Sequence, residues 1–174
     1  QLRLVTQKIT EARGCAFVIE NLPGASGNLA AERVARAAPD GYTLLYSSAG
    51  PIFFNKSLFR KLNYDIERDF EAISQFAATP NILAVHPSQP FRTVQELIAF
   101  AKANPGKLRY GSAGSGSSQH LSMELFKSLT GVNIAHIPYK ASSQMTTELV
   151  AGEFELAFQN APLILPHVRS GRLR

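Results

Sequence analysis

The segment LRYGSAGSGSSQH, residues 108–120, sets the pattern of the whole chain. Its first three residues are consistent with a short strand, and the stretch from His120 to Leu129 repeats apolar side chains at helical spacing. Eight glycine, serine and alanine residues lie between them, at 111–118. A strand that passes through a small-residue loop into a helix is the repeating unit of an α/β fold, which is the fold class we predict.

The same alternation continues on both sides of this segment. Towards the N-terminus, Thr93 and Glu96 form a capping box that predicts the start of a helix. Towards the C-terminus, Asn160 precedes a helix with Pro162 in its first turn. Alternating runs elsewhere favour a largely parallel sheet with flanking helices. These runs predict strands at 72–76, 82–86, 134–137 and 154–158, and a helix at 143–150.

The first fifty residues follow the alternation less regularly. Apolar spacing predicts a helix over 1–13. Strands are predicted at 16–19 and 43–46, on either side of a helix for which Ser26 is the expected cap. Because the chain opens in a helix already under way and stops as a new element should begin, we expect a fragment that lacks a piece at each end.

Composition and charge exclude several classes of function. The formal net charge is +5, but the basic residues are scattered and do not alternate with aromatic ones, so we predict no nucleic-acid partner. A diffuse positive charge instead suits a small anion. The single cysteine, Cys15, excludes an internal disulfide and is expected to be buried. His86, His136 and His167 lack metal-ligand spacing, so neither a metal nor a cofactor is predicted.

The small-residue loop is the strongest candidate for a ligand site. Glycines let a backbone adopt positive φ and approach a ligand, and a helix start offers unpaired N–H groups to an anion. The loop lacks both the Gly-Lys-Ser/Thr ending and the Gly-x-Gly-x-x-Gly spacing of nucleotide-binding loops. Neutral donors of this kind suit a carboxylate. The predicted ligand-binding residues here are Gly114, Ser115, Gly116, Ser117, Ser118 and His120.

Two more loops follow predicted strands, and each has a plainer alternative. Ser47, Ser48 and Ala49 could converge with the first loop at the carboxyl ends of the strands, or form an ordinary turn. Asn160 could bind the ligand or only cap its helix. The rival function is an α/β hydrolase that uses Ser117 or Ser118 with His120. The Gly-x-Ser-x-Gly elbow of such enzymes is absent, and no acid within the loop is placed to orient the histidine.

Five separated motifs resemble the Bug proteins, the TctC-like receptors of tripartite tricarboxylate transporters. The motifs are ENLPGASGN at 20–28, ARAAPDGYTL at 35–44, YGSAGSGSSQHL at 110–121, HIPYK at 136–140 and LPHVRSGRL at 165–173. The resemblance implies a type II periplasmic binding protein with two α/β lobes and a ligand cleft between them. It places residues 1–78 in part of one lobe and 79–174 in the other, with a hinge near 77–81.

The resemblance also implies the function. A monomeric periplasmic receptor, not an enzyme, would capture a small carboxylate and close around it, then present it to membrane transporter subunits or to a sensor protein. Ser47–Gly50, Gly114–His120 and Asn160 are the positions that match the family's cleft. Two positions depart from its usual pattern, Ala141 for glycine and Gln159 for an acid, and the second could alter ligand choice. The expected missing pieces would leave a fragment that folds poorly or binds weakly.

Overall fold

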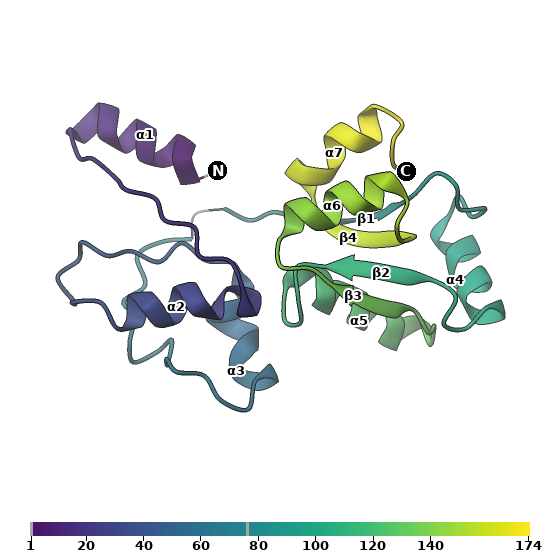
Figure 1. Ribbon diagram of the computed structural model, residues 1–174, viewed down its shortest axis with the longest axis horizontal. Helices are drawn as coiled ribbons and strands as arrows, with labels where there is room; N and C mark the ends of the chain where they lie inside the picture. The colour runs from purple at the N-terminus through teal and green to yellow at the C-terminus, as the bar shows by residue number, and fades with distance from the viewer. Residues whose placement is uncertain (1, 76) are drawn as a thin grey trace.

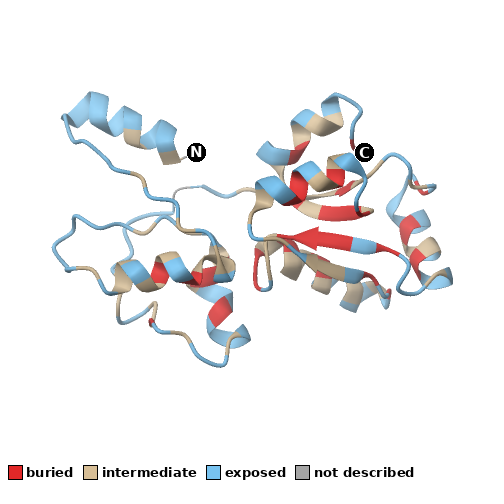
Figure 2. Cartoon of the chain, viewed as in Figure 1, coloured by how far each residue is buried: buried red, intermediate tan, exposed pale blue. Residues whose placement is uncertain are grey.

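The chain forms two parts that touch at the small-residue loop. The computed structural model describes residues 2–75 and 77–174, and Figure 1 shows the N-terminal part, residues 2–75, beside the C-terminal part, residues 77–174. A single four-stranded sheet lies in the C-terminal part. Most of the buried residues in Figure 2 gather around that sheet.

The sheet is mixed and mostly parallel. Its strand order is β1-β4-β2-β3; β2 runs parallel to β3 and β4, and β1 runs antiparallel to β4. The strands are β1 (Asn81–Val85), β2 (Arg109–Ser112), β3 (Ala135–Pro138) and β4 (Leu156–Asn160). Since β2, β3 and β4 are parallel, their carboxyl ends meet at one edge of the sheet.

Helices cover both faces of the sheet and make a three-layer α/β/α arrangement. On one face, α4 (Val94–Ala103) and α5 (Ser118–Thr130) bury Leu97 and Met123 with Tyr110 of β2. On the other face, α6 (Ser142–Ala151) and α7 (Ala161–Arg169) bury Leu149 and Ile164 with Ala157 of β4. The capping box of Thr93 and Glu96 is present at the start of α4, and Pro162 lies in the first turn of α7, as predicted.

The N-terminal part contains short helices. Its elements are α1 (Leu2–Arg13), η1 (Ala25–Gly27), α2 (Asn28–Ala35), η2 (Gly50–Phe54) and α3 (Asn55–Leu58). Of these, α2, η2 and α3 meet at a buried polar cluster, whereas α1 has no buried residue. Asn28 accepts hydrogen bonds from the side chains of Asn55 and Tyr64, and all three residues are buried. The Tyr64 hydroxyl also lies 3.0 Å from the carbonyl oxygen of Pro51, so the cluster joins α2 to η2 and α3.

Three expected strands are wrong, and so is the expected burial of Cys15. Residues 16–19, 43–46 and 72–75 form no strand in the structure; Phe76, the last residue of the third, lies outside the described residues. β-branched and aromatic residues favour a strand only where a neighbouring strand pairs with it. No such pairing occurs within residues 2–75 as described. Cys15 is therefore exposed, and Val18 is 92% exposed.

Candidate functional site

The expected site lies at the carboxyl edge of the sheet. β2 leads into the loop 113–117, here called the Gly-Ser loop, and α5 follows it directly. β4 ends at Asn160 on the same edge. The N-terminal part meets the sheet at this edge, because Gly50 and Ser26 approach the Gly-Ser loop. Of the loop 47–50 that the sequence nominated, Gly50 lies against Gly116 of the second nominated loop.

Glycines are required in the Gly-Ser loop because another backbone and side chain lie against it. Gly114 and Gly116 have φ values of 101° and 89°, which L side chains rarely adopt. A Cβ atom at Gly114 would lie 2.9 Å from the hydroxyl of Ser26, and one at Gly116 would overlap the side-chain oxygen of Asn55. Gly50 faces the carbonyl oxygen of Gly116, with only 3.0 Å available to a Cβ. Small residues therefore permit the two parts to touch.

Ser26 connects the two parts instead of capping α2. Its hydroxyl donates a hydrogen bond to the carbonyl oxygen of Ser115 at 2.5 Å. The residue has a φ of 55°, and Gly27 takes the N-cap position of α2 without a side-chain bond. The prediction that Ser26 caps the helix was wrong, because its hydroxyl reaches a partner 89 residues away in sequence.

Some polar groups of the Gly-Ser loop form hydrogen bonds within the loop and stabilise its conformation. The Gly114 amide donates to the Ser112 hydroxyl at 3.1 Å, and the Ser117 amide donates to the Gly114 carbonyl at 3.1 Å. The Ser117 hydroxyl accepts from the His120 amide at 3.3 Å and so caps α5. The Ser118 and Gln119 amides, which come first in α5, have no intrahelical acceptor. Donors for an anion therefore remain at the helix start.

Four serine hydroxyls in the two nominated loops lack a hydrogen-bond partner in the described part of the protein. Among the described residues, the hydroxyls of Ser47, Ser48, Ser115 and Ser118 form no hydrogen bond with the protein. Ser47 and Ser118 are partly buried, whereas Ser48 and Ser115 are exposed. Ala49 precedes η2 and its backbone is helical. These hydroxyls come from both parts of the chain, two from residues 2–75 and two from residues 77–174, and their role in binding stays a prediction.

His120 lies beside a second histidine that the sequence did not associate with the site. The ring of His136, on β3, lies 4.6 Å from the His120 ring and stacks on Tyr110 at 4.7 Å. Burial lowers the pKa of His120, and burial together with the neighbouring His120 lowers the pKa of His136 to about 4. Both imidazoles are therefore neutral at pH 7. His136 Nε2 lies 2.7 Å from the Ser112 hydroxyl and so supports the base of the Gly-Ser loop.

The geometry does not favour the hydrolase. His120 Nδ1 accepts the Gly116 amide at 3.4 Å, and the Ser118 hydroxyl has no hydrogen bond to the imidazole. Glu124, one turn further along α5, accepts from Tyr110 and Lys127 at 2.6 and 2.7 Å. It is therefore engaged elsewhere and does not orient His120 as the acid of a triad does.

Asn160 has a side chain that α7 does not use. The residue occupies the N-cap position, but its side chain forms no capping hydrogen bond. It pairs in register with Asn81 at the start of β1, whose own Nδ2 donates to Ser122 at 3.0 Å. Asn81 Oδ1 is buried without a partner. Of the two alternatives left by the sequence, capping is thus excluded for the Asn160 amide.

Sequence reasoning missed a buried polar network behind Asn160. Gln159 is fully buried, and its side chain joins β4 to α5 and α6 through Gln119, Thr146 and Ser142. In the sequence, Gln159 stands out only because the family that the chain resembles usually has an acid at this position. Alternation along β4 could have placed Gln159 on the buried α6 face, but its partners come from segments 13 to 40 residues away.

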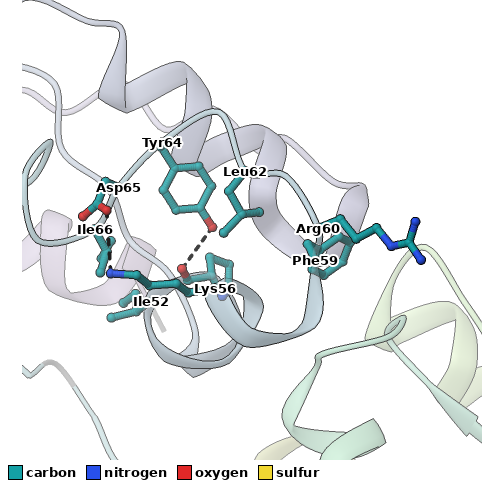
Figure 3. A pocket seen from close by; sticks show the side chains of 9 residues that line it. Ile52, Lys56, Phe59, Arg60, Leu62, Tyr64, Asp65 and Ile66 are labelled. Atoms are coloured by element: carbon teal, nitrogen blue, oxygen red, sulfur yellow. Dashed lines mark hydrogen bonds and ion pairs between the residues drawn. The ribbon is translucent and has the colours of Figure 1, made fainter.

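A separate cavity lies in the N-terminal part. Figure 3 shows it between Lys56, Tyr64 and Asp65, with Lys56 Nζ 3.7 Å from the Asp65 carboxylate. Its volume is about 140 Å³. Small-molecule sites usually enclose roughly 300 Å³ or more, and none of the nominated residues lines this cavity. It is a packing gap beside η2 and not the candidate site.

This architecture is that of a periplasmic solute-binding protein. Three solved structures superimpose with TM-scores of 0.95, 0.93 and 0.92, and each alignment covers 99% of this chain. They are R. palustris Rpa4515 with adipate, 39% identical; the periplasmic binding protein BugD, 28% identical; and MatC (Rpa3494) from Rhodopseudomonas palustris with bound malate, 30% identical. The alignments cover 58%, 57% and 58% of those chains, respectively.

The chain belongs to the tripartite tricarboxylate transporter receptor family, TctC, whose sequence profile matches residues 2–174. Members of this family are periplasmic solute-binding receptors and not enzymes. The chain spans about half the length of the curated relatives it matches. Within the described residues, no helix has both the length and the apolar character to cross a bilayer, and no cluster of three or more potential metal ligands occurs.

Proposed function

We propose that the protein captures a small dicarboxylate between its two parts and delivers it to a membrane transporter. The observation that carries this proposal is the approach of Gly50 to Gly116 beside the start of α5, where, among the described residues, the first helix amides and the hydroxyls of Ser115 and Ser118 lack protein partners. Ser47 and Ser48 come just before Gly50 in the chain and would add donors from the other side. All these donors are neutral. A carboxylate accepts several such hydrogen bonds, and the helix dipole of α5 favours its charge.

The comparisons support the ligand class. Adipate and malate, the ligands in two of the superimposed structures, both carry two carboxylates. We assign one carboxylate to Ser115, Ser118 and the first amides of α5, with Asn160 donating its amide hydrogens from β4. Ser47, Ser48 and the backbone of Ala49 and Gly50 close the other side.

Capture would proceed by closure of two lobes. We place residues 1–78 in one lobe and 79–174 in the other, with a hinge at 77–81, where a single segment joins the parts (Figure 1). A ligand that contacts both lobes stabilises the closed form by its differential affinity for it. Small-angle scattering should then show a smaller radius of gyration with ligand than without. An unchanged radius at saturating ligand would contradict closure.

The test of the binding function is a thermal-shift screen of a protein that carries this sequence. Adipate, malate and related mono-, di- and tricarboxylates are the probes. A ligand at one hundred times its dissociation constant should stabilise the fold by about 2.7 kcal/mol. Asn160→Ala and Ser118→Ala should abolish most of the shift while leaving the unliganded melt in place. A folded protein with no shift from any carboxylate would contradict the proposal.

A further inference from the structure

One buried oxygen at the junction of the two parts lacks a hydrogen bond. Asn55, the first residue of α3, is 0% exposed, and its Nδ2 donates to Asn28 Oδ1 within the polar cluster of the N-terminal part. Its own Oδ1 is buried and has no hydrogen-bond partner among the described residues. An amide oxygen left in this state raises the free energy of the conformation that buries it.

The neighbour of this oxygen across the junction is Gly116 of the Gly-Ser loop. A Cβ atom on Gly116 would overlap Asn55 Oδ1, so the oxygen faces the loop at close range. The Gly116 amide does not serve it, because that amide donates to His120 Nδ1 at 3.4 Å. On its other side, the Asn55 nitrogen is held by Asn28 Oδ1, which also accepts from the Tyr64 hydroxyl at 2.9 Å. Separation of the two parts would uncover the oxygen and give it water as a partner.

A second polar contact across the junction has the opposite effect. The Ser26 hydroxyl donates to the Ser115 carbonyl oxygen at 2.5 Å, and this bond can form only while the two parts touch. A net hydrogen bond and an unpaired buried acceptor have free energies of similar size and opposite sign. Closure therefore gains little from these two groups together. The hydrogen bonds of a ligand would then decide whether the junction stays closed.

We propose that Asn55 sets the affinity of the ligand site by disfavouring the closed junction when no ligand is bound. This inference rests on the proposed function, because it takes ligand binding and closure to be coupled. Closure moves Asn55 Oδ1 from water to a place without a donor, and part of the binding free energy of the ligand offsets this cost. The apparent affinity falls with the fraction of receptor that is closed before binding. Asn55 is thus a positioning residue that acts through Gly116 and does not touch the ligand.

The test is Asn55→Leu, which keeps a side chain of similar length but has no group that needs a hydrogen bond. Adipate is titrated by calorimetry into a protein that carries this sequence. The variant should bind adipate about fivefold or more tightly than wild type. Its ligand-free radius of gyration, measured by small-angle scattering, should be smaller than that of wild type. Replacement of a residue with only a structural role would weaken binding or leave it unchanged.

Three further variants separate this effect from packing. Asn55→Ala removes the same amide without added bulk and should also bind more tightly, so the test stays decisive if leucine does not fit. Ser26→Ala removes the bond that favours contact and should bind adipate a few-fold more weakly than wild type. Asn133→Leu makes the same replacement at an exposed position just before β3, at the opposite edge of the sheet, and should bind like wild type.

The outcomes distinguish the inference from the function on which it rests. If wild type binds adipate and both folded Asn55 variants bind it with equal or lower affinity, the inference is overturned and the proposed function stands. Tighter binding with an unchanged ligand-free radius would overturn it too, because the gain would not come from closure. A folded wild type that binds no adipate would overturn the dicarboxylate function and the inference with it.

Discussion

At the scale of single residues, glycines lie where the two parts approach each other. Gly116→Ala should destabilise the fold by roughly 2 kcal/mol or more, since it adds a clash with Asn55 to the cost of a positive φ. Gly131→Ala is the matched control: its φ is 70°, but nothing lies within 4 Å of the added Cβ, so it should cost only about 1 kcal/mol. Urea denaturation measures both. Equal losses would show that the contact with Asn55 carries no energy.

The histidine pair makes stability depend on pH. An unfolded histidine has a pKa of about 6.5, whereas burial lowers that of His136 to about 4. The neutral form is therefore favoured by folding; this stability is complete above pH 6.5 and is lost as the pH falls towards 4. His136→Gln should lose roughly 1 to 3 kcal/mol less than wild type between pH 7 and pH 4.5, as measured by urea denaturation at each pH. Parallel losses in the two proteins would contradict this assignment.

At the scale of elements, the two capped helices differ in their distance from the site. Ser117 caps α5 at the Gly-Ser loop, and Thr93 caps α4 away from it. Replacing either by alanine should cost about 1 kcal/mol of stability. Only Ser117→Ala should also weaken adipate binding, because it loosens the helix start that we assign to the carboxylate. Calorimetry on both variants separates the loss of stability from the loss of adipate affinity. Equal adipate affinities in the two variants would show that the start of α5 does not contact the ligand.

The elements that sequence predicted well are those fixed by local signals. The capping box at Thr93, the proline at 162 and the small-residue loop before α5 each act within a few residues, so they could be found without tertiary information. The failed strands at 16–19 and 43–46 needed a paired neighbour, which is not a local property. The reach of Ser26 to Ser115, the pairing of His120 with His136 and the Gln159 network all join distant segments, and no sequence spacing reveals them.

The unpaired segments should also be the least protected elements. Residues 14–20 and 42–48 lie outside helices and strands, and Val18 and Tyr42 are each 92% exposed. Their amides should exchange within seconds, whereas those of β2 and β4, at the centre of the sheet, should exchange only through global opening. Hydrogen exchange followed by mass spectrometry distinguishes the two groups. Protection of 14–20 equal to that of β4 would mean that a partner covers this segment.

At the scale of the whole molecule, the two parts are joined by small residues and few strong bonds. Among the described residues, contacts between the parts include the Ser26–Ser115 hydrogen bond and the close approaches at Gly50, Gly114 and Gly116. In our proposal, such a junction opens without ligand and is stabilised when a ligand adds hydrogen bonds from both sides. This junction agrees with our proposal of a receptor that encloses its solute and releases it again.

The most direct test of this account is a calorimetric titration of adipate into a protein that carries this sequence, repeated with Asn160→Ala. The account predicts saturable binding at one site in the wild type and at least about tenfold weaker binding in the variant. The variant loses the Asn160 side-chain amide, which we assign to hydrogen bonds with the ligand carboxylate. Binding of equal strength in both proteins would place the ligand elsewhere. Absence of binding by a folded wild type would contradict the capture of a dicarboxylate at this junction.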